Sequence, residues 1–364
     1  VVATYDSGFL AVNQNDPSNQ FKRVHFDVPN ISEARNRACD HAAGEIVAFI
    51  DDDAVPEPTW LDHLIVPFAD EKVGVAGGFV RGRNGISWQW RARKLDALGR
   101  AADLDVDTKK TTVFEPPSKG SLKTAGTIMA VRRNTLIALS RFDETDLNMR
   151  LAREGWRTAS VPQAHVQHGY ASSARRSTDR IPSDLTEIGA SWAVFLNRYC
   201  SPRDVRLRWS EIKREERHRA LHHMQRGGLD ATSVYRLLNS LERGFKKGLG
   251  RKTGTGSITS TPSSAFLRIP VESRPSRVFH GWSWQRRAVM SEAQAAVDEG
   301  SIATAFLFSP TALFHQHRFL DDGVWLQTGG LFGQSDRLQP VVRAHSFATR
   351  VAAEKARIGL VRGY

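Results

Sequence analysis

The sequence predicts an α/β fold in which a mainly parallel sheet is flanked by helices, with an additional C-terminal α/β or α+β region. In residues 24–80, extended apolar runs alternate with helical patterns at the spacing of strand, helix, strand units. The run from Glu45 to Ile50 is almost entirely apolar, as expected for a strand buried on both faces of a parallel sheet. Residues 277–308 repeat the strand, helix, strand order near the C-terminus.

The individual elements follow from local signals along the chain. A Ser-Glu start and an Ala-rich interior predict a helix over residues 32–41, and Thr59 is a candidate N-cap for an apolar helical stripe that stops near Pro67. A charged helical pattern covers residues 87–112, and another helix runs from the acidic residues 143–146 to Gly155. Extended runs predict strands over residues 24–26, 45–50, 73–80, 123–131, 158–161 and 164–168.

Length and composition divide the chain into three predicted parts. The 364 residues exceed the usual size of one domain. Residues 1–200 form the first domain, and residues 201–264 form a basic helical segment followed by a flexible linker rich in Gly, Ser and Thr. The stretch 201–252 holds fourteen Lys and Arg against six acids. No pattern assigns a role to residues 265–364.

The overall composition indicates a protein of a reducing compartment, and we expect a cytoplasmic location. The only cysteines, Cys39 and Cys200, are too few for a disulfide framework, and no apolar run is long enough to cross a bilayer. The net charge of +12 favours polyanions, anionic membrane surfaces or phosphorylated substrates, and charge alone does not choose among them. Peripheral contact with the anionic inner face of a membrane is one of these expectations. The chain begins at Val1 without Met or a secretory signal, which predicts a fragment or a processed form.

Three acidic residues, Asp51, Asp52 and Asp53, directly follow the predicted strand 45–50. In open α/β sheets, ligands bind beyond the carboxyl ends of the strands. Alternate positions of an extended chain point to the same side, so Asp51 and Asp53 can converge on Mg2+ or Mn2+ while Asp52 turns away or contacts a ribose. Such an ion neutralises a diphosphate leaving group. A solvated turn or a helix start is the alternative, and the preceding buried strand favours the ligand site.

A second acidic group, Asp143, Glu144 and Asp146, opens the helix that follows. A carboxylate held beside a metal site would take the proton of an acceptor hydroxyl, whereas helix capping explains acids in a first turn equally well. His168 is a candidate metal ligand at a strand end. His165 lies on the opposite face of an extended chain, so at most one of the two faces the site.

Five motifs follow one another in a fixed order. They are Asn-Ile-Ser-Glu-Ala-Arg-Asn-Arg-Ala at 30–38, Ala-Gly-Glu-Ile-Val-Ala-Phe-Ile-Asp-Asp-Asp-Ala-Val-Pro at 43–56, Val-Ala-Gly-Gly at 75–78, Ala-Gly-Thr-Ile-Met-Ala-Val-Arg-Arg at 125–133 and Phe-Asp-Glu-Thr-Asp-Leu-Asn-Met-Arg-Leu at 142–151. In this order, residues 30–170 resemble the family-2 glycosyltransferases of the GT-A fold.

The resemblance implies an inverting, hexosyltransferase-like reaction. A sugar would pass from a nucleotide-diphosphate sugar to a hydroxyl of a glycan, a lipid-linked acceptor or a cell-surface polysaccharide. The resemblance also implies that Asp53 binds Mg2+ or Mn2+, that Asp51 and Asp52 face the ribose and diphosphate, and that Arg35 lies near the nucleotide.

The same resemblance gives Glu144 as the catalytic base. Two acidic elements of the family are fused in this stretch, so Asp146 and Asp143 remain the alternatives. The family's first strand and helix have no counterpart here, because residues 9–13 resemble its second strand.

Two other functions compete with this interpretation. The basic stretch 201–252 would suit a nucleic-acid-binding protein, but its only aromatics are Trp209, Tyr235 and Phe245 and it matches no known module, so we expect no nucleic-acid partner. A catalytically inactive sugar-binding relative is the other alternative, since the first family elements are missing.

The C-terminal region contains further candidates that we interpret as structural. His315, His317, Asp321 and Asp322 would suit a second metal site, but the pair Asp322-Gly323 is typical of a hairpin turn with alternating polar strands beside it. Trp282, Trp284 and Trp325 could stack on a sugar, and we expect them in the core instead.

Overall fold

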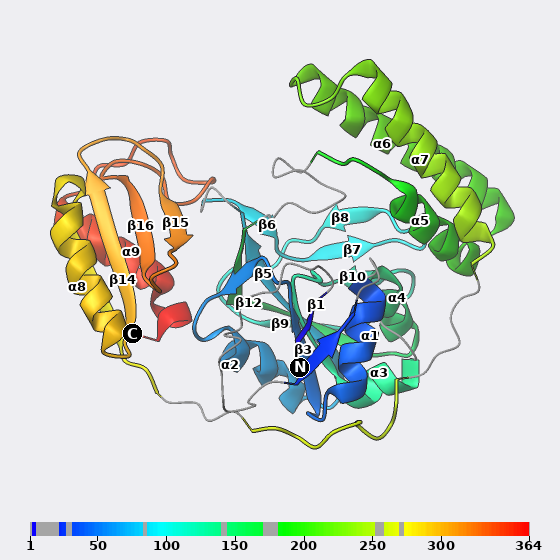
Figure 1. The fold of residues 1–364 in the computed structure, drawn as a ribbon, viewed down its shortest axis with the longest axis horizontal. Coiled ribbons are helices and arrows are strands. Elements are labelled where there is room, and N and C mark those ends of the chain that lie inside the picture. The colour runs from blue at the N-terminus through cyan, green and yellow to red at the C-terminus, as the bar shows by residue number, and fades with distance from the viewer. Residues whose placement is uncertain are drawn as a thin grey trace.

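The computed structural model describes residues 2–4, 22–26, 31–82, 86–139, 144–169, 181–251, 258–268 and 273–363. Figure 1 shows three groups of elements: a central sheet with helices around it, a long helical group on one side, and a second sheet with two helices on the other. The predicted strand-like stretch at 9–13 lies outside the described residues.

The central sheet has the strand order β3-β11-β5-β12-β4. Its strands are β3 (Ile46–Ile50), β11 (Ile128–Arg132), β5 (Val73–Arg81), β12 (Arg157–His168) and β4 (Ala54–Pro56), with β6 (Trp88–Trp90) paired to β5 and β9 (Thr112–Phe114) paired to β12. Strand β12 is parallel to β5, and β11 is antiparallel to both β3 and β5. Strands β3, β5 and β12 therefore run in one direction.

The α/β class is confirmed, but the sheet is mixed rather than mainly parallel. Most of its pairings are antiparallel, because β11 lies between β3 and β5, and β4, β6 and β9 also run against their partners. An apolar run identifies a strand without giving its direction. Burial also differs from the prediction: in β3 only Phe49 is buried, whereas every residue of β5 is buried.

Helices cover both faces of this sheet. They are α1 (Ile31–His41), α2 (Trp60–Ile65) with the 3-10 turn η1 (Val66–Ala69), α3 (Arg133–Leu139) and α4 (Glu144–Arg153). Leu64 of α2 packs on one face with Ala76 and Val80. The other face packs against residues of α1, α3 and α4, including Leu136 and Leu147. Short parallel strands β1 (Val2–Thr4) and β2 (Arg23–His25) lie near the N-terminus.

Two local predictions are wrong. The stretch 87–112 contains strands rather than a helix: β6, β7 (Arg93–Leu95) and β8 (Ala101–Asp103), and β10 (Ser121–Lys123), β7 and β8 form a small covering sheet. Arg81 packs on the indole of Trp88, and Arg93 packs on the indole of Trp90. Charged residues therefore interrupt the apolar alternation that would have indicated strands.

The two predicted strands at 158–168 are the single strand β12, whose register shifts between Val161 and His165. Pro162 lies within this shift and cannot donate a ladder hydrogen bond. A side chain at Gly78 would collide with the Ala164 carbonyl oxygen of the bulge, at 2.2 Å, which explains the glycine.

The helical prediction for residues 203–247 is confirmed by α6 (Pro202–Gln225) and α7 (Ala231–Leu249), which pack with α5 (Thr186–Tyr199). Ser201 caps α6 by accepting from the Asp204 amide. The described part of the predicted linker, residues 258–264, lies against the central unit: Ile258 is buried there and the Thr259 amide donates to Asp40.

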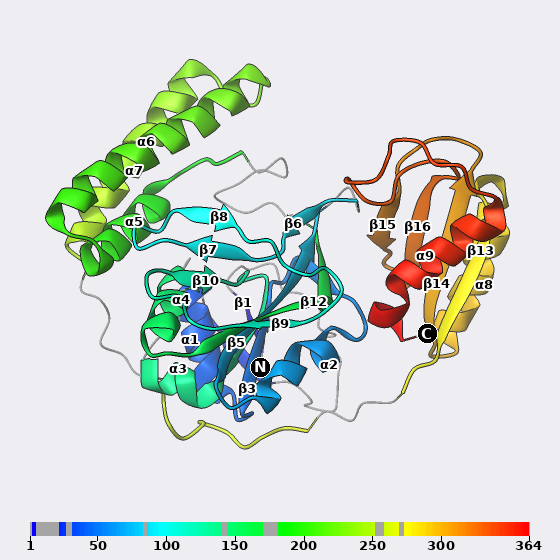
Figure 2. The same ribbon diagram turned by 180° about the vertical axis from the view of Figure 1, so that it is seen from behind.

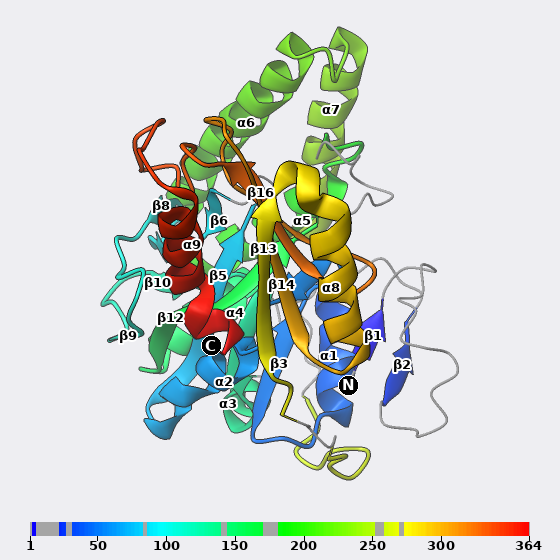
Figure 3. The ribbon, with the colours of Figure 1, turned by 90° about the vertical axis from the view of Figure 1, so that its left-hand side faces the viewer.

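The C-terminal region is an α/β unit with the strand order β13-β14-β16-β15. Its elements are β13 (Ser276–Trp282), the 3-10 turn η2 (Ser283–Gln285), α8 (Arg286–Asp298), β14 (Ile302–Ser309), β15 (Gln316–Phe319), β16 (Trp325–Gly330) and α9 (Phe347–Arg362). Helices α8 and α9 cover opposite faces of this sheet (Figure 3). The turn between β15 and β16 contains Gly323 with a left-handed φ of +83°, as the Asp-Gly pair predicts. Trp325 is in the core, whereas Trp284 is 67% exposed, which corrects its assignment.

Helix α9 lies between its own sheet and the central unit (Figure 2). Arg362 near its end forms a buried ion pair with Glu57, with Nε to Oε2 at 2.7 Å. The backbone carbonyl of Leu360 accepts from the Thr59 hydroxyl, so Thr59 does not cap α2 with its side chain. Within the described part of the chain, no helix combines the length and apolar character that a membrane span requires.

Candidate metal and nucleotide-sugar site

The candidate site lies at the edge of the central sheet where β3, β5 and β12 end. Because these strands run in one direction, their carboxyl ends share this edge. Asp51, Asp52 and Asp53 follow β3 directly, and His168 is the last residue of β12. The predicted position of the acidic triplet, beyond the carboxyl end of a strand, is therefore the observed one.

Asp51 and Asp53 do converge, but not through an extended backbone. Residues 52 and 53 form a tight turn in which the Ala54 amide donates to the Asp51 carbonyl at 3.1 Å. The turn reverses the chain into β4, which pairs antiparallel with β12 and places His168 opposite Ala54. This register brings His168 beside Asp53, although the two residues are far apart in sequence.

The three side chains form a group that fits a divalent cation. One potential ligand atom from each of Asp51, Asp53 and His168 lies within 4.8 Å of the others, and all three residues are half-buried. His168 Nε2 is 3.0 Å from Asp53 Oδ1. Two carboxylates and one imidazole form a mixed oxygen and nitrogen donor set that suits Mn2+ better than Mg2+.

Gln89 of β6 orients His168. Its Oε1 lies 2.9 Å from His168 Nδ1. An amide oxygen can only accept, so Nδ1 donates its hydrogen to Gln89 and Nε2 is the ring atom that faces Asp53. This support for a metal-binding histidine was not predicted, because Gln89 sits in the stretch mistaken for a helix.

Arg35 of α1 holds Asp51 in place. Its Nη2 donates to Asp51 Oδ1 at 2.6 Å and to the Gly126 carbonyl at 3.0 Å. The guanidinium thus links the end of β3 to the loop that precedes β11. This loop belongs to the Ala-Gly-Thr motif, so three of the predicted motifs meet here.

Asp52 is not a member of this group and is exposed. Partial burial of its carboxyl group, together with the charges of Asp53 and Asp51, raises its pKa above the ordinary value. Three adjacent carboxylates repel one another, so a cation bound at Asp51 and Asp53 would relieve this repulsion.

Helix α4 contacts the segment that precedes the loop held by Arg35. Asn148 Oδ1 accepts from the Thr124 amide at 3.4 Å, just before the loop that contacts Arg35. Asp143 and the side chain of Glu144 lie outside the described residues. Asp146 is held in an ion-pair cluster: its carboxylate accepts from Arg198 Nη1 at 2.6 Å and from Arg150 Nε at 2.8 Å.

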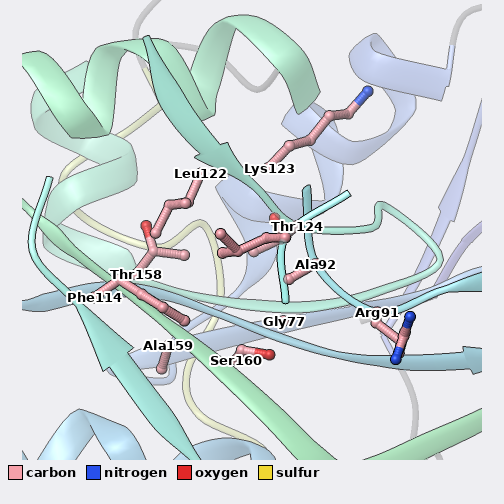
Figure 4. A pocket seen from close by; sticks show the side chains of 11 residues that line it. Gly77, Arg91, Ala92, Phe114, Leu122, Lys123, Thr124, Thr158, Ala159 and Ser160 are labelled. Carbon is pink, nitrogen blue, oxygen red and sulfur yellow. The ribbon is translucent and has the colours of Figure 1, made fainter. Parts of the chain in front are cut away.

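A small pocket lies next to the same loop, beside β5, β12 and the small covering sheet (Figure 4). Gly77, Arg91, Lys123, Thr124 and Ser160 are among the residues that line it. The lining is mainly apolar. No signal in the sequence predicted this pocket, because it depends on strands β7 and β10 folding over the central sheet.

The C-terminal candidates do not join this site. His315 and His317 lie on the face of the second sheet that α9 covers, and the metal-compatible group found among the described residues is Asp51, Asp53 and His168. The structural interpretation of the C-terminal histidines agrees with this arrangement.

Known proteins show where the resemblance lies. Residues 19–180 match the model of a family described as "Glycosyltransferase like family 2". The solved structure "Crystal structure of GalNAc-T7 with UDP, GalNAc and Mn2+" is 14% identical with a TM-score of 0.35, over 48% of this chain and 36% of that chain. "Crystal Structure of a Mycobacterial Protein" is 18% identical with a TM-score of 0.30, over 49% of this chain and 57% of that one. This chain thus spans less than two thirds of either structure, and none of the curated proteins compared matches it.

Proposed function

We propose a reaction for this chain on the basis that its residues 19–180 match the model of the glycosyltransferase-like family 2. The domain transfers a sugar from a nucleotide-diphosphate donor to an acceptor hydroxyl, with inversion at the anomeric carbon. The observation that supports this most directly is the convergence of Asp51, Asp53 and His168 where three strands of one direction end.

Asp51, Asp53 and His168 would hold Mn2+ or Mg2+. The ion would neutralise the charge that develops on the diphosphate as the sugar leaves. Gln89 and Arg35 keep two of these ligands in position, so the site is organised before the donor binds. Arg35 also supplies a positive charge beside the nucleotide.

Glu144 is the base in this proposal. As the acceptor oxygen bonds to the anomeric carbon and the bond to the diphosphate breaks, Glu144 takes the proton of the acceptor hydroxyl. Asp146 is a weaker candidate because Arg150 and Arg198 and the hydroxyl of Tyr199 already occupy its oxygens. Glu144 begins α4. Asn148 of the same helix contacts Thr124, which lies just before the loop that Arg35 contacts through Gly126.

Calorimetry with MnCl2 and a panel of UDP, GDP, CDP and dTDP tests the donor site. We expect one diphosphate to bind in a Mn2+-dependent manner, and Asp53→Ala to abolish this binding while leaving the unfolding midpoint nearly unchanged. Asp62→Ala, an exposed acid of α2, is the matched control and should bind like the parent. Binding that is equally strong in Asp53→Ala and the parent would refute the metal assignment.

A second experiment separates the enzyme from an inactive sugar-binding relative. With the identified nucleotide, the corresponding sugar donors are incubated with the full chain, and release of the free diphosphate is measured with and without glycan acceptors. Turnover supports the transferase. Tight, metal-dependent donor binding without any turnover across lipid-linked and soluble glycan acceptors would favour the inactive relative.

We also assign the basic helices α6 and α7 to contact with an anionic membrane surface, where lipid-linked acceptors are found. Arg243, Lys246 and Lys247 are exposed on α7, and each basic residue near such a surface contributes about 1 kcal/mol. Their replacement by Gln should weaken sedimentation with phosphatidylserine vesicles, whereas Arg286→Gln and Arg287→Gln on α8 should not. An equal loss of vesicle sedimentation in both variants would contradict a specific membrane-binding surface on α7.

A further inference from the structure

The sheet face beneath α9 carries a buried group of polar side chains where an apolar core is usual. We call this group the α9 polar cluster; its members are His315, His317, Gln327, Arg350, Glu354 and Arg357. All except Arg357 are at most 5% exposed. His317 and Gln327 are direct partners on the neighbouring strands β15 and β16, so their side chains share this face.

The hydrogen-bond directions within the cluster are fixed by its arginines. Arg357 Nη2 lies 2.8 Å from His317 Nε2, and a guanidinium can only donate, so Nε2 accepts and the hydrogen of the neutral ring is on Nδ1. Similarly, His315 Nδ1 faces Arg350 Nη2, so its Nε2 donates to Gln327 Oε1 at 2.7 Å. The amide nitrogen of Gln327 is therefore left as a donor.

Three atoms of this cluster have no hydrogen-bond partner among the described residues, and all three are donors. They are His317 Nδ1, Gln327 Nε2 and Arg350 Nε. A buried donor without an acceptor destabilises the folded state, because it has lost its hydrogen bonds to water. Three such donors on neighbouring side chains indicate that an acceptor belongs among them.

The charges of the cluster indicate which kind of acceptor fits. Burial lowers the pKa of His315 to about 3 and that of His317 well below its usual value, so both rings are neutral near pH 7. Burial alone would raise the pKa of Glu354, but the surrounding His315, Arg357 and Ser335 hold it at about 2. Two guanidiniums then face one carboxylate, and one positive charge lacks a counter-charge within the cluster.

A water molecule would satisfy these donors less well than an anion. Water also donates two hydrogens, and the cluster has few acceptor positions for them: the carboxylate of Glu354 accepts from Ser335 and Arg357 and lies against His315 and Arg350, and Gln327 Oε1 accepts from His315. A monovalent anion offers only acceptor positions and supplies the missing negative charge.

We propose that the α9 polar cluster is a binding site for a small monovalent anion of chloride size, held by His317, Gln327 and Arg350. The anion would lie under α9, the helix that joins the C-terminal sheet to the central unit. This inference is independent of the reaction proposed for the Asp51 site.

Thermal unfolding of the full chain in NaCl and in sodium gluconate at equal ionic strength tests the site. Gluconate is too large to enter, so chloride should raise the unfolding midpoint of the parent in a saturable manner, as a ligand bound only by the folded state does. In Gln327→Glu, a carboxylate replaces the amide donor and supplies the negative charge that the anion would bring. The difference in unfolding midpoint between NaCl and sodium gluconate should therefore disappear. Arg286→Gln on the exposed surface of α8 is the matched control and should keep it.

A crystal of the parent protein soaked in bromide gives a second measurement that does not depend on any variant folding. An anomalous peak within hydrogen-bond distance of Gln327 Nε2 and His317 Nδ1 is the expected result. Identical midpoints in chloride and gluconate for the parent, or ordered water at this position in bromide, would overturn the proposal.

Discussion

Glu144 and Asp146 lie two residues apart at the start of α4, and the contacts of Asp146 give it a structural role. Asp146 accepts hydrogen bonds from two arginines and a tyrosine, which fixes α4 to α5. A carboxylate used in this way stabilises structure and has few lone pairs left for an acceptor proton. Proton transfer and structural support are therefore assigned to different residues of one motif.

We predict that Glu144→Gln lowers turnover by about 10²- to 10⁴-fold while Mn2+ and diphosphate affinity stay at the parental level, because only the proton acceptor is lost. Asp146→Asn should instead lower the unfolding midpoint, since it weakens a partly buried ion-pair cluster. Steady-state kinetics, calorimetry and thermal unfolding of both variants separate these effects. Inactive but stable Asp146→Asn beside active Glu144→Gln would reverse the assignment.

Gln89 is not one of the three candidate metal ligands, and its proposed role is to act on one of them, His168. We predict that Gln89→Leu weakens Mn2+ binding by about 10- to 100-fold, because His168 loses the partner that fixes its tautomer and ring orientation. Gln89→Glu keeps an acceptor at the same position and should retain Mn2+ affinity. Isothermal titration of both variants, with the exposed Gln225→Leu as control, measures the difference, and equal affinity in all of them would contradict the role.

Among the elements, the helix α9 connects the C-terminal unit to the candidate site. Glu57 directly follows β4, the strand that aligns Asp53 with His168, and it accepts from both Arg362 and Gln167. The end of α9 thus contacts and stabilises the connection between β4 and α2. The C-terminal unit therefore supports the positions of Asp53 and His168 from outside residues 19–180.

We predict that Arg362→Met destabilises the protein by about 3 to 5 kcal/mol, because it leaves Glu57 charged and unpaired in a buried position. The double variant Arg362→Met with Glu57→Gln should recover part of this loss, since no buried charge remains. Chemical unfolding measures both, and Mn2+ titration of the double variant reports whether β4 has shifted. A double variant that is no more stable than the single one would argue against the buried pair.

Particular elements explain what could be predicted from the sequence. The acidic triplet and β3 were predictable because an apolar run ends directly in three acids. Helix α9 was not, because its inward side carries Arg350, Glu354 and Arg362, and charged residues at buried positions erase the apolar period. The charged pattern of residues 87–112 predicted a helix in place of the short strands β6 to β8, and Gln89 was missed with them. Contacts set by tertiary structure, such as the alignment of Asp53 with His168, leave no local signal.

At the scale of the whole molecule, buried neutral histidines make stability dependent on pH. The folded-state pKa of His315 is about 3, below its ordinary value of 6.5, because burial disfavours the charged ring, and the pKa of His317 is lowered in the same direction. The unfolded chain therefore binds more protons than the folded chain below about pH 6.5. Stability is fully present above this pH and falls as the pH decreases.

We predict that the free energy of unfolding falls by about 2 kcal/mol for His315 alone between pH 7 and pH 5, from 1.36 kcal/mol per pKa unit. Denaturant titrations at both pH values measure this, and His315→Gln should flatten the dependence while lowering stability at pH 7. The exposed His218→Gln should leave the slope unchanged. An equal slope in His315→Gln and the parent would exclude this histidine as the cause.

The register between β4 and β12 also has a consequence for the order in which the protein folds. Asp53 comes early in the central unit and His168 comes at its end, so the third cation ligand is absent until β12 has paired with both β4 and β5. Long-range pairings of this kind form late in folding. Tight Mn2+ binding during refolding would therefore report the time at which β12 pairs with β4 and β5. A stopped-flow metal indicator would detect this binding only after most of the secondary structure has formed.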